Sequence, residues 1–528
     1  MRVLISDSMS EKGIELLKGN SKLQVDVRTD LSPENLLGCI GEYEVLLVRS
    51  KTKVNKDVIE AGKKLKLIGR AGTGVDNVDL PYASKKGIVV MNTPGGNTVS
   101  AAEHTISMML SLSRNIPQAY MSMKNRIWEK KKYMGTEVKD KVLGIIGLGR
   151  IGSEVAKRAI GLSMKVIGFD PIINKDRAKE MGIELTSLDK IFRESDYITI
   201  HVPKTKETEN MINESTLEKM KKTVRIINCA RGGIINEKDL AEAVKTGRIA
   251  GAALDVFDKE PSFDSPVMEV ENIIVTPHLG ASTEEAQEQV AVDLAKQVID
   301  YCEKGIINNA VNMPSIDQEQ MKILEPYIDL AEKLGLIASQ MNDGSVNKIK
   351  VRYSGDILKY NVTPLTLSVL KGFLEPVLDE KGSLNLINVS LIAEERGIKV
   401  EESKTSNLKN YTNLIELEIR THKSVNHVSG TLFGNKVARL VYLGDSQIDV
   451  IPGKYLLLCY NHDKTGVIGK IGTILGENEI NIASMHTGRS EKGGTAITVI
   501  NIDSYVPEEI IKKLRGIKEI IDIKMLRL

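Results

Sequence analysis

A glycine-rich turn near residue 150 constrains the fold of this 528-residue chain more than any other feature. The apolar run Val142-Leu-Gly-Ile-Ile146 leads directly into Gly147-Leu-Gly-Arg-Ile-Gly152, and a helical pattern follows over 153–159. The first glycine permits a tight turn, the second lets the backbone approach a pyrophosphate, and the third lets the helix pack closely on the strand. The pattern therefore predicts a strand, turn and helix that bind a dinucleotide.

An acidic residue completes this pattern at the end of the next strand. Asp170 lies eighteen residues beyond Gly152. Its carboxylate can accept hydrogen bonds from ribose hydroxyl groups and would repel a 2′-phosphate, which favours NAD over NADP. Arg177 lies nearby in sequence and could accommodate a 2′-phosphate, so NADP stays open as an alternative.

Strong strand signals on both sides of the turn define a domain at 98–282. Six short apolar runs alternate with crossover segments, and six is the number of strands in a complete doubly wound sheet. The runs are Val142–Ile146, Lys165–Phe169, Tyr197–Val202, Arg225–Asn228, Ala250–Asp255 and Ile273–Thr276. A helical stretch from Val99 to Leu112 connects this domain to the segment before it.

The segments 1–97 and 283–312 are predicted to form one substrate-binding domain. Residues 1–97 alternate β-branched runs with helical patterns, which is typical of βαβ units and a parallel sheet. Ser282-Thr-Glu-Glu predicts a capping box that opens one long helix, and Gly305 would end it. A cleft between the two domains is expected to close around the ligand by motion at the two crossings.

The C-terminal part of the chain divides into two further segments. Asn312-Met-Pro-Ser-Ile is typical of a linker, and 313–453 mixes helix and strand without recognisable catalytic spacing. Ile451-Pro-Gly-Lys454 marks a second boundary. Residues 454–528 follow the order β-α-β-β-α-β, which predicts a ferredoxin-like domain.

Composition excludes several classes of partner. Lys and Arg total 72 and Asp and Glu total 70, so no strongly basic field indicates nucleic acid or a membrane surface. No apolar stretch is long enough for a membrane span. The four cysteines are scattered and form no CxxC pair, so neither a metal site nor a disulfide framework is expected. These features favour a cytoplasmic protein.

Three polar residues follow strand ends, where the chemistry of an open α/β sheet is located. Histidine can take a hydroxyl proton near neutral pH, as His278 would do, and a carboxylate such as Glu260 can fix its tautomer. The guanidinium of Arg231 can hold a substrate carboxylate through two hydrogen bonds. From the residues alone, each also has a purely structural interpretation, because single His, Glu and Arg residues often pair locally or face solvent.

Three segments resemble the signatures of the D-isomer-specific 2-hydroxyacid dehydrogenases: Asn228-Cys-Ala-Arg-Gly-Gly233, Leu254-Asp-Val-Phe-Asp-Lys-Glu-Pro261 and Thr276-Pro-His-Leu-Gly-Ala-Ser-Thr283. The resemblance implies an α/β fold, with a Rossmann-like NAD domain inserted in a flavodoxin-like substrate domain. It also implies that Arg231, Glu260 and His278 are catalytic and that Asp255 contacts the nicotinamide amide. The implied cofactor-binding residues are Gly147, Gly149, Arg150, Ile151, Gly152, Asp170, Pro203, Thr208, Cys229, Asp255 and Gly280.

Other segments resemble the long branch of this family, which oxidises 3-phospho-D-glycerate with NAD at the entry to L-serine synthesis. They are Val48-Arg-Ser50, Arg70-Ala-Gly-Thr-Gly-Val-Asp-Asn77, Asn92-Thr-Pro-Gly-Gly-Asn97 and Trp128-Glu-Lys-Lys-Lys-Tyr-Met-Gly-Thr-Glu137. By resemblance, the backbone at Thr73 and Gly74 would hold the substrate carboxylate. Arg49, Arg70, Asn97 and Lys130 would surround the phosphate, with Lys130 coming from either the same or a neighbouring subunit.

The resemblance extends to the C-terminal half. Residues 315–453 resemble the branch's intervening α+β domain, and 455–528 resemble an ACT domain, a module that binds amino acids at a subunit interface. Asp463 and Asn481 match its effector positions, which implies L-serine as an effector and a homo-oligomer, usually a tetramer. Two departures are Thr465-Gly466, where Pro-Gly is usual, and Ile451, where an Arg would complete an anion site.

Two rival functions remain open at the level of sequence. The first is another D-2-hydroxyacid dehydrogenase, such as a glycerate, hydroxypyruvate or 2-oxoglutarate reductase. The second is an NAD-responsive binding scaffold built on the same fold, because fold does not fix function. The complete Arg231, Glu260 and His278 set favours an enzyme.

Overall fold

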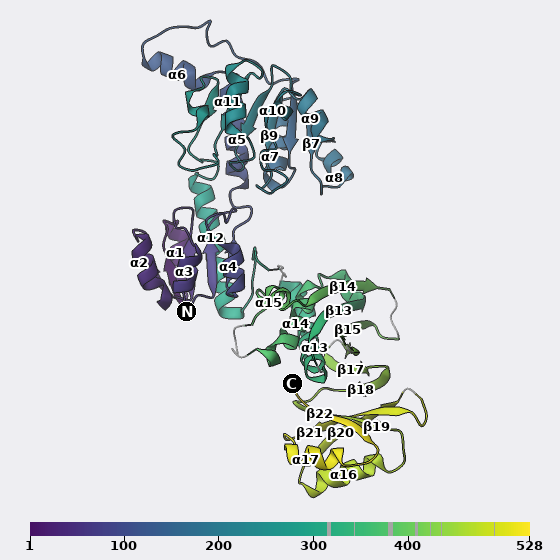
Figure 1. The fold of residues 1–528 in the computed structure, drawn as a ribbon. Helices are drawn as coiled ribbons and strands as arrows, with labels where there is room; N and C mark the ends of the chain where they lie inside the picture. Colours follow the sequence, from purple (N-terminus) through teal and green to yellow (C-terminus); the bar gives the residue numbers. More distant parts are fainter. Residues whose placement is uncertain are drawn as a thin grey trace.

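The computed structural model describes residues 1–313, 318–342, 344–378, 384–406, 410–422, 424–434, 436–489 and 491–528. It contains four sheets, which follow one another along an elongated molecule (Figure 1). The first two sheets, with their helices, form the part of the molecule that matters for the site.

The N-terminal sheet is parallel throughout and has the strand order β2-β1-β3-β4-β5, which is the flavodoxin-like order. Its strands are short, and the central ones are almost fully apolar. Helices cover both faces of the sheet, so the side chains on both faces are buried. The strands are β1 (Arg2–Ile5), β2 (Gln24–Val27), β3 (Val45–Val48), β4 (Leu67–Arg70) and β5 (Val89–Asn92). The helices are α1 (Glu11–Lys18), α2 (Pro33–Cys39), α3 (Lys56–Ala61) and α4 (Leu80–Lys85).

The second sheet has seven parallel strands in the order β12-β11-β10-β9-β6-β7-β8, so the predicted Rossmann-like fold is confirmed. All six predicted strands are present, and the sequence analysis missed β8 (Glu184–Leu185). The strands it found are β6 (Val142–Ile146), β7 (Lys165–Phe169), β9 (Tyr197–Ile200), β10 (Arg225–Asn228), β11 (Gly251–Leu254) and β12 (Ile273–Val275). The helices are α6 (Ile116–Lys124), α7 (Arg150–Gly161), α8 (Lys175–Glu180), α9 (Leu188–Glu194), α10 (Glu214–Leu217) and α11 (Glu237–Lys245).

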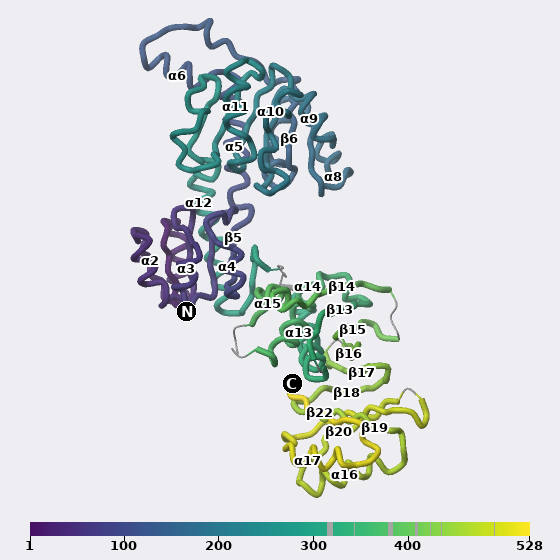
Figure 2. The backbone as a smooth tube through the Cα atoms, in the orientation of Figure 1, coloured from purple at the N-terminus to yellow at the C-terminus, as the bar shows by residue number. Residues whose placement is uncertain are grey.

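The chain crosses between these two domains twice, and a helix follows each crossing (Figure 2). Helix α5 (Thr98–Ser113) begins directly after Asn97 and packs against α7. Helix α12 (Glu284–Lys304) returns to the first domain and packs against α1. Its N-cap is Thr283, whose hydroxyl accepts from the Ala286 N–H, so the helix begins one residue later than a cap at Ser282 would give. The predicted capping box does not form, because Ala286 at the third helical position has no side chain to return the bond. Gly305 ends the helix at φ 67°, as predicted.

The last two sheets share part of one core. The intervening sheet has the order β14-β13-β15-β16-β17-β18 and the last sheet has the ferredoxin-like order β20-β21-β19-β22. The strands are β13 (Val346–Gly355), β14 (Lys399–Thr405), β15 (Asn413–Thr421), β16 (Val425–Phe433), β17 (Val437–Leu443), β18 (Ser446–Val450), β19 (Tyr455–His462), β20 (Ile482–Arg489), β21 (Thr495–Ile502) and β22 (Ile520–Arg527). The helices are α13 (Gln318–Met341), α14 (Thr363–Leu374), α15 (Val389–Glu395), α16 (Val467–Glu477) and α17 (Glu508–Arg515).

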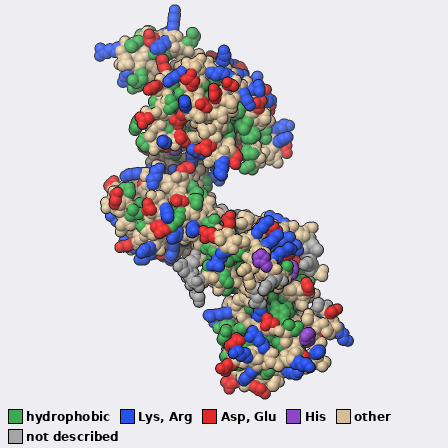
Figure 3. Space-filling view, in the orientation of Figure 1, with side chains coloured by type: hydrophobic (Ala, Val, Ile, Leu, Met, Phe, Trp, Pro, Cys, Tyr) green, Lys and Arg blue, Asp and Glu red, His purple; other side chains and the backbone are tan. Residues whose placement is uncertain are grey.

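Acidic and basic side chains are interspersed over the face of the molecule shown in Figure 3. Among the described residues, no helix combines the length and apolar character that a membrane span requires.

Candidate active site

The glycine turn between β6 and α7 has the geometry that a dinucleotide needs. Gly147 has φ 95°, and a Cβ atom there would lie 2.5 Å from the His201 carbonyl oxygen. A Cβ at Gly152 would lie 2.0 Å from the Gly147 carbonyl oxygen, whereas Gly149, the N-cap of α7, faces open space. Side chains are therefore excluded where the chain packs on itself, and the helix N-terminus stays open to a phosphate group.

Asp170 is fixed at the end of β7, beside this turn. Its Oδ2 accepts from the Leu148 N–H at 2.8 Å, and its Oδ1 accepts from the Ile172 and Ile173 N–H groups. Burial alone would raise the pKa of this carboxyl, but the three backbone donors together hold it below its usual value. The group is thus an anion, as ribose recognition requires. Arg177 is paired with Glu180 at 3.1 Å on α8.

His278 and Glu260 form a hydrogen-bonded pair after adjacent strands. His278 Nδ1 lies 2.8 Å from Glu260 Oε2, and Glu260 Oε1 accepts from the Phe257 N–H at 3.1 Å. The hydrogen bond that His278 donates to the Glu260 carboxylate raises the pKa of His278 against the opposing effect of burial. The carboxylate can orient the imidazole so that Nε2 is left to exchange a proton with a ligand.

Arg231 reaches across to the other domain. Its Nε lies 3.1 Å from Oδ2 of Asp76, which follows β4, and its Nη1 donates to the Ala230 carbonyl oxygen at 2.7 Å. Asn228 at the end of β10 holds this turn through the Arg231 carbonyl oxygen and the Ala230 N–H. Asp76 was not singled out from sequence, because only the fold brings it to this guanidinium.

A cavity of about 290 Å³ lies between the two domains and collects residues from both. Ten of the predicted site residues line it: Arg70, Thr73, Gly74, Asn97, Ile151, Pro203, Cys229, Arg231, His278 and Gly280. Asp76 and His201 also line it, although neither was predicted. The side chains of Arg70, Arg231 and His278 therefore line one space beside the glycine turn.

Arg70, the last residue of β4, is the most buried cation of this cavity. Burial, with repulsion from Arg231 and then Arg49, lowers its pKa to about 10. Its Nε is buried and has no hydrogen-bond partner in the structure. A guanidinium in such a place is costly unless an anion completes it.

Two other predicted phosphate residues lie outside the cavity. The Arg49 guanidinium donates to the Ser8 carbonyl oxygen at 3.2 Å, and its backbone N–H donates to Asp7. Lys130 is exposed on the segment after α6, which projects from the molecule in Figure 1. Neither Arg49 nor Lys130 is among the residues that line the cavity. Thr208, a predicted cofactor-binding residue, does not line it either, and its hydroxyl donates to the Pro203 carbonyl oxygen within the same loop.

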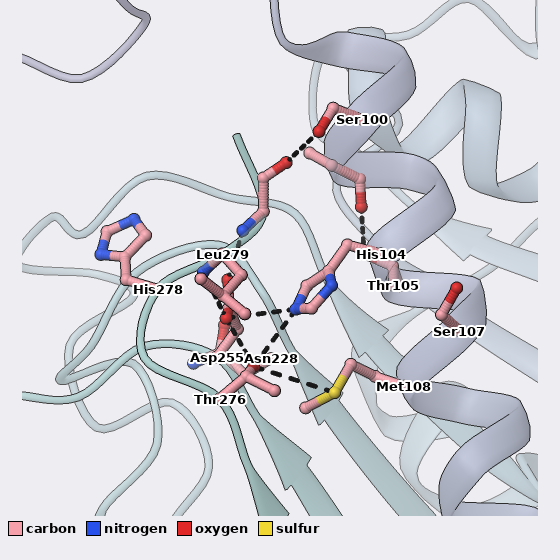
Figure 4. A network of polar contacts seen from close by, with 12 residues as sticks. Ser100, His104, Thr105, Ser107, Met108, Asn228, Asp255, Thr276, His278 and Leu279 are labelled. Carbon is pink, nitrogen blue, oxygen red and sulfur yellow. Dashed lines mark hydrogen bonds and ion pairs between the residues drawn. The ribbon is translucent and has the colours of Figure 1, made fainter. Parts of the chain in front are cut away.

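Asp255 is fully buried behind the cavity and does not line it. Its carboxylate accepts from Thr276 Oγ1 and from the Leu279 and Gly280 N–H groups at 2.6–2.8 Å (Figure 4). His104 Nε2 lies 3.2 Å from the same carboxylate. The implied contact with nicotinamide stays a prediction, whereas the structure gives Asp255 partners that sequence analysis did not identify.

The two predicted effector residues belong to separate networks in the last domain. Asp463, between β19 and α16, accepts from the Gly493 N–H at 3.0 Å and from Arg489 Nη1 at 2.9 Å, and these two bonds lower its pKa. Asn481, at the start of β20, donates to Asp503 at 2.6 Å.

Comparison with known proteins places this site in a family. Residues 106–280 match the family described as D-isomer specific 2-hydroxyacid dehydrogenase, NAD binding domain. Residues 323–444 match the D-3-phosphoglycerate dehydrogenase intervening domain, and 455–519 match the ACT domain. A solved D-lactate dehydrogenase from Aquifex aeolicus, complexed with NAD and lactic acid, is 31% identical with TM-score 0.52, covering 60% of this chain and all of its own.

Two curated relatives match over nearly the whole length. The D-3-phosphoglycerate dehydrogenase of Synechocystis sp. is 44% identical over 99% of this chain and 95% of its own. The enzyme of the same name from Archaeoglobus fulgidus is 42% identical over 99% of both chains. The chain therefore belongs to the D-3-phosphoglycerate dehydrogenase family of the D-isomer-specific 2-hydroxyacid dehydrogenases.

Proposed function

We propose that this chain oxidises 3-phospho-D-glycerate with NAD to 3-phosphohydroxypyruvate, the first step of L-serine biosynthesis. The observation that carries the proposal is the cavity where the imidazole of His278, backed by Glu260, faces the guanidinium groups of Arg231 and Arg70. A base and two separate cationic groups suit a substrate with one hydroxyl and two anionic ends.

The roles follow from the geometry. Arg231 holds the substrate carboxylate and the C2 oxygen, in place of its present partner Asp76. Nε2 of His278 takes the hydroxyl proton, and Glu260 stabilises the imidazolium that forms. The glycine turn and Asp170 would hold NAD, which supplies the hydride acceptor when bound. C2 loses its hydrogen with both bonding electrons and the hydroxyl loses its proton, so the C2–O bond becomes a carbonyl.

The deciding experiment follows NADH absorbance with purified protein, NAD and 3-phospho-D-glycerate, with the ketone product trapped by hydrazine. D-Glycerate runs in parallel. NADH from the phosphorylated acid alone supports the proposal. Turnover only of an unphosphorylated acid would replace the substrate while keeping the hydride chemistry, and a folded, NAD-binding protein that turns over no 2-hydroxy acid would favour the scaffold interpretation.

The pH dependence should reveal the pair of His278 and Glu260. Because Glu260 raises the pKa of His278, the neutral base needed for oxidation is lost as pH falls through that raised value. Glu260→Gln removes the negative charge, so the acid limb of kcat/KM for oxidation should move to lower pH and kcat should fall by about 10²-fold. Steady-state rates from pH 5 to 9 measure both effects. An acid limb that stays in place or moves to higher pH would contradict the assignment.

We further propose that L-serine regulates the enzyme through the last domain, and that the active form is a homotetramer in the cytoplasm. The position of Asp463 between β19 and α16 supports the first point, and the four free cysteines suit a reducing compartment. Light scattering of the full chain tests the tetramer.

L-Serine should inhibit the wild-type enzyme, and Asp463→Ala should weaken that inhibition at least tenfold because an ammonium group loses its carboxylate partner. Initial rates against serine concentration measure this. Glu508→Gln, on the exposed face of α17, is the matched control with unchanged inhibition. Wild-type inhibition in the Asp463 variant would place the effector elsewhere.

A further inference from the structure

We infer that His104 is a positioning residue, which holds the loop of the catalytic histidine through the buried carboxylate of Asp255. The inference deepens the proposed function and rests on it, because it assigns a role to a side chain that serves the same reaction. Figure 4 shows the network from α5 to the loop that carries His278.

Asp255 is the centre of this network. It follows β11, its side chain is inaccessible to solvent, and both of its oxygens accept hydrogen bonds. Burial favours the protonated form, but the bonds from His104, Thr276 and Leu279 outweigh it and keep the pKa below its usual value. A buried carboxylate with several donors fixes the positions of those donors, since loss of any one leaves charge unsatisfied.

The donors belong to one short loop. Thr276 Oγ1, Leu279 N–H and Gly280 N–H reach the carboxylate, and the His278 N–H donates to the Asp255 carbonyl oxygen at 2.9 Å. At the apex of the loop, His278 has φ 57°, a left-handed conformation that is uncommon for histidine. Such a conformation persists only where its surroundings hold it, and Asp255 is the group that does so.

His104 supplies the donor that lies outside the loop. Its Nε2 lies 3.2 Å from Asp255 Oδ1 and 3.2 Å from Thr276 Oγ1. The threonine hydroxyl gives its own proton to Asp255 at 2.6 Å, so both contacts of His104 require a proton on Nε2. One turn earlier on α5, Ser100 Oγ donates to the Gly280 carbonyl oxygen at 2.9 Å. Helix α5 thus holds the loop at two points, and it is also the helix that follows the first domain crossing.

The same atoms do not favour a metal ion. The ligand atoms of His104, Cys229 and Asp255 lie within 4.8 Å of one another. Burial, and then the charge of Asp255, raise the pKa of the Cys229 thiol to about 12, which disfavours the thiolate that a metal would need. Both oxygens of Asp255 already accept hydrogen bonds from protein donors.

Loss of the His104 donor should loosen the loop and weaken the contact between His278 and Glu260. The raised pKa of His278 depends on that contact, so the acid limb of kcat/KM should move to lower pH, in the same direction as in Glu260→Gln. We expect kcat to fall about ten- to a hundredfold, because small misplacements of a reacting group have effects of this order. NADH affinity should fall much less than kcat, since the glycine turn and Asp170 are untouched and only the nicotinamide end lies near the loosened loop.

Three variants of the full chain test this. His104→Leu removes the donor at similar volume, His104→Gln keeps an N–H at the reach of Nε2, and Ser107→Ala is the matched control on the exposed face of α5. The expected result is a large loss of kcat with the pH shift in the leucine variant, near wild-type behaviour in the glutamine variant, and no change in the control. Wild-type kcat in His104→Leu, or equal losses in the leucine and glutamine variants, would overturn the inference.

A second readout does not depend on turnover. Diethylpyrocarbonate acylates neutral imidazole, so its rate of reaction at His278, followed by peptide mapping against pH, reports the pKa of that residue in the protein without substrate. The midpoint should fall in His104→Leu and not in His104→Gln. This comparison can be made even if the wild type does not oxidise 3-phosphoglycerate. It therefore tests the positioning role of His104 separately from the proposed function. An unchanged midpoint in a folded leucine variant overturns the inference. His104→Asn, whose shorter side chain cannot carry an N–H to the position of Nε2, replaces the leucine variant where thermal unfolding shows that the latter does not fold, and an unchanged midpoint there has the same meaning.

Discussion

His278→Asn should lower kcat for oxidation of 3-phosphoglycerate by about 10²- to 10⁴-fold, the range that general bases contribute. Asparagine is chosen because it tolerates positive φ better than most residues, and the backbone at this position has φ 57°. The loop around Asp255 should therefore keep its shape while the proton acceptor is removed. Stopped-flow or steady-state NADH formation measures kcat, and quenching or enhancement of NADH fluorescence measures cofactor affinity.

Retained NADH affinity is the internal control for this variant, and His278→Ala shows how much of any loss comes from the backbone. A variant that keeps more than a tenth of wild-type kcat would remove His278 from the role of base. The other histidine of the cavity, His201, then has to be considered. Burial lowers its pKa to about 4, so a base at His201 would give no acid limb near neutral pH. The pH profile therefore distinguishes the two histidines without a further variant.

The sequence predicted those features that depend on local pattern. A strand, three glycines at fixed spacing and an acidic strand end can be recognised because backbone conformation and close packing restrict those positions to few residue types. The parallel direction of both sheets followed from alternating strands and helices, whereas their strand orders were implied only by the family resemblance. The two-residue strand β8 was missed, because Glu184–Leu185 has no apolar run or alternation to mark it.

The features that were not predicted depend on contacts between distant segments. His104 lies on a helix rich in small apolar residues and has no motif of its own, and only folding brings it to Asp255, far along the chain. Asp76 likewise meets Arg231 across the two domains. Arg49 and Arg70 looked equivalent in sequence, yet one bonds a backbone carbonyl outside the cavity and the other is buried inside it. Whether such an arginine enters the cavity depends on the direction of its side chain at the end of the strand, and that direction cannot be predicted from the residue type.

Arg70→Met should lower kcat/KM for 3-phosphoglycerate by about 10²-fold or more, because truncating one partner of a buried charge pair costs 2–5 kcal/mol and about 1.4 kcal/mol is a factor of ten. The loss for D-glycerate should be within about threefold, since that substrate has no phosphate. Arg2→Met, at the opposite end of the same sheet, is the matched control with unchanged kcat/KM. Equal losses for the two substrates would assign Arg70 to the carboxylate and leave the phosphate to other residues.

The same variant should be at least as stable as the wild type without ligand. Arg70 is a largely buried cation with an unpartnered Nε. Its burial and the repulsion from Arg231 and Arg49 outweigh the attraction of Asp76 and Asp7, so methionine of similar length removes a net cost. Replacing buried charge with apolar side chains is often neutral or stabilising by about 1–4 kcal/mol. Thermal unfolding with and without 3-phosphoglycerate should show an unchanged or higher Tm for the free variant and loss of the ligand-induced rise seen in the wild type. A lower Tm in the free variant would mean that Arg70 stabilises the fold. A free variant that is as stable as the wild type but no longer binds 3-phosphoglycerate would mean that the charge of Arg70 serves to bind the anionic ligand.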